Sequence, residues 1–161
     1  MVSVEQDLLH LVSAVRTGGG EGMRQALSAI LGAVAPFDRA EIAFLREGEV
    51  VHWALGGTRG PVAGDDLVRH VAAHPVSVRV DHREEAEPFP STAERMDAQG
   101  LASLLALPIN GEGGIEGAIV LARSYGWAFA GAPLRRLRPI AVMTGLLLDV
   151  AQQLRAGRRR R

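Results

Sequence analysis

Histidine side chains are the first candidates for chemistry in this chain. His70 and His74 lie four residues apart, which on a helix places two imidazoles on one face at a spacing suited to metal ligands. No nearby side chain completes the four ligands that such a site needs, so we expect two solvated histidines and no metal ion or other cofactor. His52 alternates with Val51 and Trp53 in a strand-like run, and we expect it on the less buried side of that strand.

The acidic segment at 81–90, DHREEAEPFP, is the second candidate. Neighbouring carboxylates can serve as general acid and base, but a run of charges bounded by prolines is more often a solvated loop. The chain has no cysteine, which excludes thiol nucleophiles, thiolate metal sites and disulfides. It also has no G-x-S-x-G motif and no glycine-rich phosphate loop that ends in Lys-Ser/Thr. We therefore expect a protein that is not an enzyme.

Charge and hydropathy narrow the classes of partner. The 18 basic side chains, all arginine, equal the 18 acidic ones, but the RRRR run at 158–161 holds part of the positive charge. Residues 1–157 are therefore net acidic, which disfavours nucleic acid as a partner, and we interpret RRRR as a tail or the start of a linker. No apolar run has the length of a membrane span, and the chain does not begin like a secretory signal. We expect a cytoplasmic protein that does not contact membranes.

The hydrophobic pattern predicts a single domain over residues 1–157. Consecutive glycines in TGGGEG, at 17–22, are expected to separate two helices because glycine loses much backbone entropy in a helix. Asp65 or Asp66 is expected to cap a short helix. The predicted elements, in chain order, are helices 4–16 and 22–34, a hairpin of strands 39–45 and 49–55, a short helix that ends near His74, strand 76–80, helix 91–100, a hairpin within 103–122 and a long helix from about Pro133.

The hairpin SLLALPINGEGGIEGAIVLA, at 103–122, is apolar on both of its alternating faces. A strand with one face in water alternates apolar with polar residues, so this hairpin is expected in the middle of a sheet with both faces covered.

Two stretches carry a resemblance to a known family. They are LLALPI…GIEGAIVLA, within 104–122, and AFAGAPLRRL…AVMTGLLL, within 128–148. On these residues the chain resembles a GAF domain, a small-molecule-sensing and dimerising module of signalling proteins, and the resemblance extends over residues 4–155. It implies an α+β fold with a GAF/PAS-like antiparallel sheet. The N- and C-terminal helices would lie on one face, and the segments 61–75 and 81–100 would roof the other. Gly117 would lie where a side chain would crowd a neighbouring backbone, or else at a strand bulge.

The chain also departs from several members of that family. GAF domains that bind bilins covalently use a cysteine, and those that reduce methionine sulfoxide use several, so neither chemistry is available here. The Asn-Lys-Phe-Asp-Glu signature of cyclic-nucleotide GAF domains is absent, and the chain has no lysine at all. The resemblance then implies either a sensor of another small molecule that signals through a homodimer, or a ligand-free dimerisation or docking module of a signalling or transcription-control protein.

For the sensor, we expect a pocket under the roof that takes a small, mostly apolar molecule with one anionic or carbonyl group. Small residues such as Ala106 and Ala118 on that face would leave room for it. In the alternative, Trp53 and Met96 fill this space. The expected lining residues are Phe44, Trp53, Phe89, Met96 and Leu104, with Arg79, His82 or Arg95 as the polar contact.

For either function we expect a homodimer, with a signalling protein as a further partner. The last predicted helix has apolar residues in a three-four repeat, typical of helices that pack side by side, and the first predicted helix has a similar stripe. The predicted interface residues are Val4, Leu8, Leu11, Val15, Ile140, Met143, Leu147, Val150 and Leu154.

Overall fold

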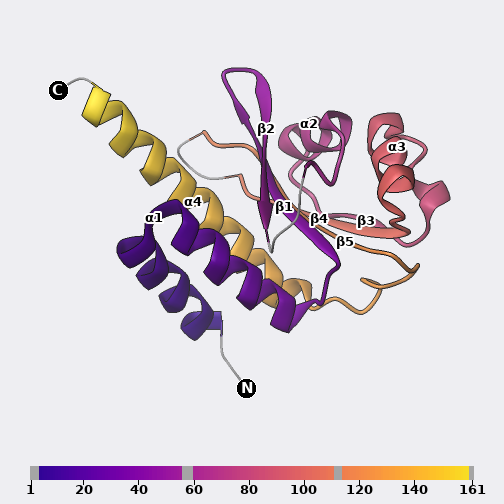
Figure 1. The fold of residues 1–161 in the computed structure, drawn as a ribbon, viewed down its shortest axis with the longest axis horizontal. Helices are drawn as coiled ribbons and strands as arrows, with labels where there is room; N and C mark the ends of the chain where they lie inside the picture. The colour runs from indigo at the N-terminus through magenta and orange to yellow at the C-terminus, as the bar shows by residue number, and fades with distance from the viewer. Residues whose placement is uncertain (1–3, 56–59, 111–113, 160–161) are drawn as a thin grey trace.

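The computed structural model describes residues 4–55, 60–110 and 114–159, and within them helices flank a single antiparallel sheet (Figure 1). The side chains of residues 4, 154–156 and 158–159 lie outside this description. In chain order the elements are α1 (Val4–Val34), β1 (Arg39–Arg46), β2 (Glu49–Leu55), α2 (Asp65–Ala73), β3 (Val78–Val80), the 3-10 helix η1 (Arg83–Ala86), α3 (Pro90–Gln99), β4 (Ser103–Pro108), β5 (Gly117–Arg123) and α4 (Leu134–Arg159).

The strands form one sheet in the order β2-β1-β5-β4-β3, and every pairing is antiparallel. The predicted central hairpin is β4 and β5, with Ala106 opposite Val120. Both strands are buried over almost their whole length because β5 lies between β1 and β4 and both faces of the sheet are covered. The predicted α+β fold class and the covered hairpin are thus confirmed.

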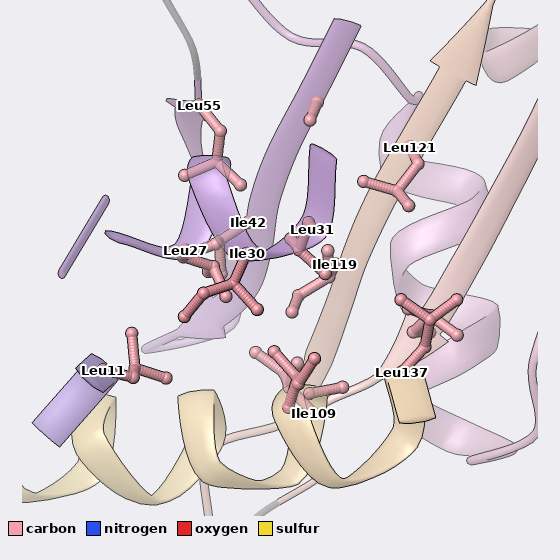
Figure 2. Close-up of a cluster of buried hydrophobic side chains, with 14 of the residues drawn as sticks. Leu11, Leu27, Ile30, Leu31, Ile42, Leu55, Ile109, Ile119, Leu121 and Leu137 are labelled. Carbon is pink, nitrogen blue, oxygen red and sulfur yellow. The ribbon is translucent and has the colours of Figure 1, made fainter. Parts of the chain in front are cut away.

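Side chains on the two faces of the sheet enter two separate hydrophobic clusters. On one face α1 and α4 cover the larger residues of the strands, among them Ile42, Ile119 and Leu121 (Figure 2). On the other face α2 and α3 cover smaller residues, such as Ala106 and Ala118 (Figure 1). We call these the helix face and the roofed face.

Gly117 lies at the start of β5, directly opposite Phe44 of β1. A Cβ atom built on Gly117 would overlap the carbonyl oxygen of Ala43 and would lie 2.6 Å from the Cα atom of Phe44. The register of β1 with β5 is regular up to this last pair, and beyond it the Leu45 N–H donates to the Glu116 carbonyl at 2.9 Å, so the glycine is not at a bulge. Of the two interpretations from sequence, close backbone approach is the one that the structure supports.

Helix α1 corrects the predicted boundary between two helices. Helical structure extends through TGGGEG, and the interruption is confined to Gly19, which has φ 62° and ψ −144°. At this residue the chain reverses, so that the first half of α1 lies beside the second half (Figure 1). A Cβ atom on Gly22 would overlap the carbonyl oxygen of Ala14, which shows how closely the two halves approach.

Helix α4 begins where the sequence predicts and contains Pro139. It continues to Arg159, two residues beyond the predicted domain boundary at residue 157. None of the helices in the described part of the chain combines the length and the apolar character needed to cross a membrane.

Candidate functional site

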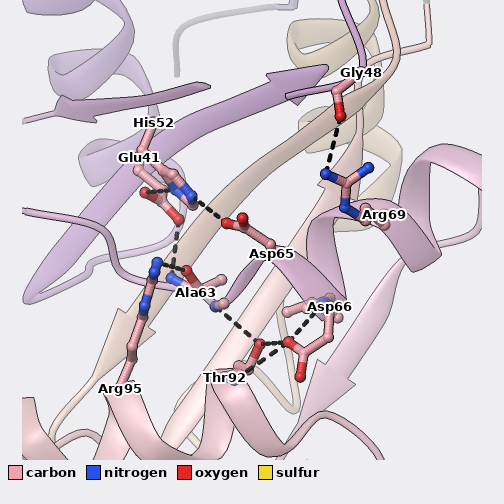
Figure 3. A network of polar contacts seen from close by, with 11 residues as sticks. Glu41, Gly48, His52, Ala63, Asp65, Asp66, Arg69, Thr92 and Arg95 are labelled. Carbon is pink, nitrogen blue, oxygen red and sulfur yellow. Dashed lines mark hydrogen bonds and ion pairs between the residues drawn. The ribbon is translucent and has the colours of Figure 1, made fainter. Parts of the chain in front are cut away.

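The main polar cluster of the described residues lies on the roofed face, and Glu41 of β1 is its centre (Figure 3). The Glu41 side chain is fully buried. Its Oε1 atom accepts a hydrogen bond from the Ala63 N–H at 2.9 Å, and its Oε2 atom lies 2.9 Å from Nδ1 of His52. A buried carboxylate is costly unless it is paired and hydrogen-bonded, and here each oxygen has a donor.

His52 of β2 connects Glu41 to the first turn of α2. Its Nε2 atom lies 2.9 Å from Oδ1 of Asp65, and its side chain is only 13% exposed. The sequence places His52 on the less buried side of its strand, but α2 covers it. Because both ring nitrogens face carboxylate oxygens, and an ionised carboxylate only accepts hydrogen bonds, both nitrogens must donate. The geometry therefore favours a positively charged imidazolium between two carboxylates.

The pKa of His52 lies above its ordinary value, and the causes oppose each other. Burial by itself lowers the pKa because it penalises the charged form. The hydrogen bond and the negative charge of Glu41, together with the hydrogen bond to Asp65, raise it by more. The positive charge of Arg95 opposes them weakly.

We therefore expect the stability of the protein to fall as the pH rises above neutrality. A raised folded-state pKa means that the contribution of His52 is fully present below its unfolded pKa of about 6.5 and is lost as the pH rises through the folded pKa. The loss is at most about 1.4 kcal/mol per pH unit for one proton. Urea unfolding measures this loss for the wild type and for His52→Gln. The pH is varied from about 5.5 to about 9, which brackets the unfolded histidine pKa of about 6.5. His52→Gln should lack this slope, whereas the exposed control His10→Gln should keep it. An equal slope in His52→Gln would contradict the assignment.

A second carboxylate, Asp66, ties α2 to the start of α3. It accepts hydrogen bonds from the Ser91 N–H at 2.7 Å and from the Thr92 hydroxyl at 2.8 Å. It also accepts one from the N–H of its neighbour Leu67 at 2.8 Å. The predicted helix cap is corrected by this arrangement, because the N-cap residue of α2 is Gly64 and the two aspartates bind other elements.

The backbone just before α2 completes the connection between sheet and roof. Besides the Ala63 N–H bound by Glu41, the Ala63 carbonyl accepts a hydrogen bond from Nη1 of Arg95 at 2.6 Å. The Gly64 N–H donates to the Thr92 hydroxyl oxygen at 3.0 Å. A Cβ atom on Gly64 would lie 2.5 Å from the Thr92 backbone nitrogen, so a larger residue does not fit. Polar contacts therefore run without a break from β1 through α2 to α3, and their chemical effect is to fasten the roof to the sheet.

The residues predicted to line a ligand pocket do not come together. Phe44 and Trp53 lie on the helix face, where their rings pack edge to face with centroids 5.2 Å apart. Met96 and Leu104 are fully buried on the roofed face, and Phe89 packs at the edge of the same cluster. The register of β1 thus excludes a pocket that contains all five residues, since the sheet itself separates them.

Apolar side chains from the roof occupy the space that the pocket was expected to use. Ala106 and Ala118 of the sheet are buried in one cluster with Leu67 and Val71 of α2 and Met96 of α3. Of the two side chains that the alternative interpretation placed here, Met96 is present and Trp53 is on the other face.

The predicted polar contacts are also apart from one another. Arg95 is part of the cluster around Glu41. Arg79, on β3 at the edge of the sheet, pairs with Asp81 at 2.9 Å, and His82 lies 2.8 Å from Glu84. These arginine and histidine side chains therefore have partners within the chain.

His70 and His74 lie with their ring centroids 5.0 Å apart. Over the described ranges, the histidine and acidic side chains form no group of three or more that could hold a metal ion.

Two residues of the predicted dimer interface belong to the core of the single chain. Leu11 and Ile140 are fully buried on the helix face (Figure 2 labels Leu11), which corrects their assignment to an outer surface. Leu11 is covered because the first half of α1 folds back, and Ile140 lies one turn from buried Leu137. The other members differ. Leu8 is partly buried, as are Val15, Met143 and Leu147, which pack against that core; Val150 is exposed; and the side chains of Val4 and Leu154 lie outside the described part.

The exposed apolar surface of α4 shares only Val150 with the predicted interface. It consists of Val142, Leu146 and Val150, which are spaced by four residues and therefore share one side of the helix. Val142 is 47% exposed and Val150 is 51% exposed, while Leu146 is partly buried. We call these three residues the α4 stripe. On α1, Leu9 is 69% exposed.

Sequence reasoning missed Glu41, Asp65, Asp66 and Thr92 as members of a site. Glu41 carried a usable signal, because a charged residue between Ala40 and Ile42 in a buried strand requires a partner. Thr92 carried none, since its partner Asp66 is 26 residues away in the sequence.

Comparison with known proteins identifies the fold. No model of a protein family and no curated protein sequence matches the chain. Among solved structures, the GAF domain of an Acinetobacter phosphoenolpyruvate-protein phosphotransferase is 14% identical, with a TM-score of 0.68 over 95% of this chain and 97% of that one. The phycocyanobilin-bound GAF domain of a cyanobacterial phytochrome is 16% identical, with a TM-score of 0.63 over 94% and 96%.

A domain assigned to a two-component sensor histidine kinase of Sinorhizobium meliloti is 21% identical, with a TM-score of 0.65 over 89% of this chain and 98% of that one. These likenesses extend over nearly the whole of each chain. The chain has the GAF fold.

Proposed function

We propose that this chain, with its GAF fold, is a regulatory module of a signalling protein that acts by pairing with a second copy through the α4 stripe. The observation that carries the proposal is the two-sided apolar character of α4. Its inner side packs on the sheet through residues such as Leu137, Ile140 and Leu148, while Val142 and Val150 of the α4 stripe, on its outer side, are exposed in the single chain. A helix of a monomer is expected to be polar on its outer side.

A two-fold pairing fits this surface because it brings the same patch of both copies together. Each stripe would then cover the other, and burial of apolar surface contributes about 25 cal/mol per Å². The names of the structural neighbours, which include a sensor histidine kinase, support placing such a module in a signalling protein.

The packing under the roof favours the ligand-free function over the small-molecule sensor. The alanines that would leave room for a ligand are buried together with Leu67, Val71 and Met96. The buried polar atoms of Glu41 and His52 already bind each other, Ala63 and Asp65. A ligand in this position would have to displace these contacts.

The dimer is tested with the double variant Val142→Glu/Val150→Glu, which places two carboxylates in the proposed interface. Desolvation of a charge costs several kcal/mol, so we expect the dissociation constant of the dimer to rise by about 100-fold or more. Sedimentation equilibrium over micromolar concentrations gives the dissociation constant. The matched control is Val76→Glu, because Val76 is 67% exposed and lies next to β3, far along the chain from α4. A monomeric wild type, or equal effects of both variants, would refute the proposal.

The ligand-free part has its own test. Mass spectrometry of the purified protein is run under native and then denaturing conditions. In both, the mass per protomer should equal that of the polypeptide alone. A small molecule that is lost on denaturation would instead support the sensor, and Met96→Ala, which opens space under the roof, would then be expected to change its affinity.

A further inference from the structure

The reversal of α1 depends on one residue. Gly18 and Gly20 are both helical, and only Gly19 between them departs from helical geometry, with φ 62° and ψ −144°. This conformation is nearly restricted to glycine, because a Cβ atom would clash with the backbone. If Gly19 became helical, α1 would be one straight helix, and residues 4–18 would point away from the rest of the chain. We call residues 4–18 the arm.

The arm is held to the remainder of the chain by a buried ion pair and by apolar packing, and neither contact depends on which copy supplies the arm. The buried carboxylate of Asp7 accepts hydrogen bonds from Nη2 and Nε of Arg136 on α4, at 2.9 and 3.2 Å. Leu11 is fully buried in the helix-face core (Figure 2). The same Asp7 and Leu11 from a second copy would fit the same surface.

The two halves of α1 approach closely at Gly22 and Ala14 but leave an open groove along one side. A groove of about 410 Å³ lies between them and is lined by small residues such as Ala14, Gly22 and Ala26, with His10 and Ala29 also on its walls. The groove is open to solvent and its walls are small side chains, so the closed arm buries little apolar surface along this side. A short hinge of this kind, with a restricted backbone, is a known condition for exchange of an element between two copies.

We propose that the surface formed by α4 and the second half of α1 is a docking site for the arm of a second copy. In the dimer Gly19 becomes helical, α1 straightens, and Asp7 and Leu11 of each copy bind Arg136 and the core of the other. This inference rests on the proposed homodimer and specifies which segments the two copies share.

Spin labels distinguish exchange from simple association. The chain has no cysteine, so His10→Cys and Ala29→Cys place two unique labels, which face the same groove when the arm is closed. Along a straight helix these positions lie about 28 Å apart. In the dimer, doubly labelled chain diluted into unlabelled chain should give the long distance by electron–electron double resonance. A mixture of the two singly labelled chains should give a short distance between copies.

Two glycine variants shift the equilibrium in a controlled way. Gly19→Ala penalises the reversal but suits the straight helix, so the dimer should tighten by tenfold or more, as measured by sedimentation. Gly20→Ala is the control, because Gly20 is helical in both forms and a Cβ atom there meets nothing within 4 Å. It should leave the dissociation constant unchanged.

The outcomes separate this inference from the dimer itself. A dimer that keeps the short distance within each chain, or that responds equally to Gly19→Ala and Gly20→Ala, would overturn arm exchange and leave the homodimer standing. A wild type that stays monomeric, with Gly19→Ala also monomeric, would overturn both.

Discussion

Replacing Glu41 with alanine is expected to lower the free energy of unfolding by about 4 kcal/mol, the largest effect that we expect from any one side chain of the polar cluster. The substitution leaves the Ala63 N–H without its acceptor and leaves His52 with one carboxylate in place of two. Removing one member of a buried ion pair costs far more than the pair contributes, because the remaining group stays desolvated.

Urea unfolding monitored by tryptophan fluorescence measures this loss. Glu41→Gln is the informative companion, because its amide oxygen can still accept from the Ala63 N–H, while its NH₂ group cannot accept from His52. It should be less damaging and should weaken the fall in stability at high pH. Glu49→Ala, at an exposed position of β2, is the control and should change stability by less than about 0.5 kcal/mol. A loss at Glu41 no larger than that of the control would show that the cluster does not hold the roof.

Gly117→Ala is expected to cost about 3 kcal/mol, although it adds a single methyl group. The new Cβ atom would overlap the Ala43 carbonyl oxygen and crowd the Cα and Cβ atoms of Phe44, at 2.6 and 2.9 Å. Backbone atoms of a central strand cannot move aside without breaking the ladder between β1 and β5.

The thermal midpoint and the urea midpoint of Gly117→Ala both report this cost. Gly131→Ala is the matched control, since a Cβ atom there meets nothing within 4 Å and the residue does not have a left-handed φ. It should be neutral or slightly stabilising. A mild effect at Gly117, comparable to that at Gly131, would mean that the two strands can separate locally at little cost.

The fold could be predicted from the sequence because its central hairpin is apolar on both faces. That pattern requires two covering layers. Which helices cover which face followed from the resemblance to GAF domains, which the residues within 104–122 and 128–148 carry. The length of α1 was missed for a local reason. A run of glycines predicts a loop from entropy, but the helical halves are held by tertiary contacts such as Leu11 in the core.

The site was harder to predict than the fold. The alternation of side chains along a strand separates its two faces, but it does not say which face will pack on the long helices and which will lie under the roof. In β1 the larger Ile42 and Phe44 face the long helices, whereas Glu41 and Ala43 face the roof, so Phe44 was assigned to the wrong side. Differences in side-chain size between the two faces were the available signal. No signal in the sequence indicated that Asp65 and Asp66 bind other elements, because an aspartate at the start of a helix is most simply interpreted as a cap.

The interior position of β1 in the sheet affects how the chain folds while it is being synthesised. β1 pairs with β2 across a short turn, but its other neighbour, β5, is about 70 residues later in the chain. At elongation rates of roughly 5–20 residues per second, the second edge of β1 waits several seconds for its partner on the ribosome. During that interval the edge exposes unpaired backbone groups beside Ile42 and Phe44, the kind of surface that chaperones bind and that drives aggregation. The yield of folded protein in cells should therefore depend on the speed of translation between β2 and β5 as much as on the stability of the finished fold.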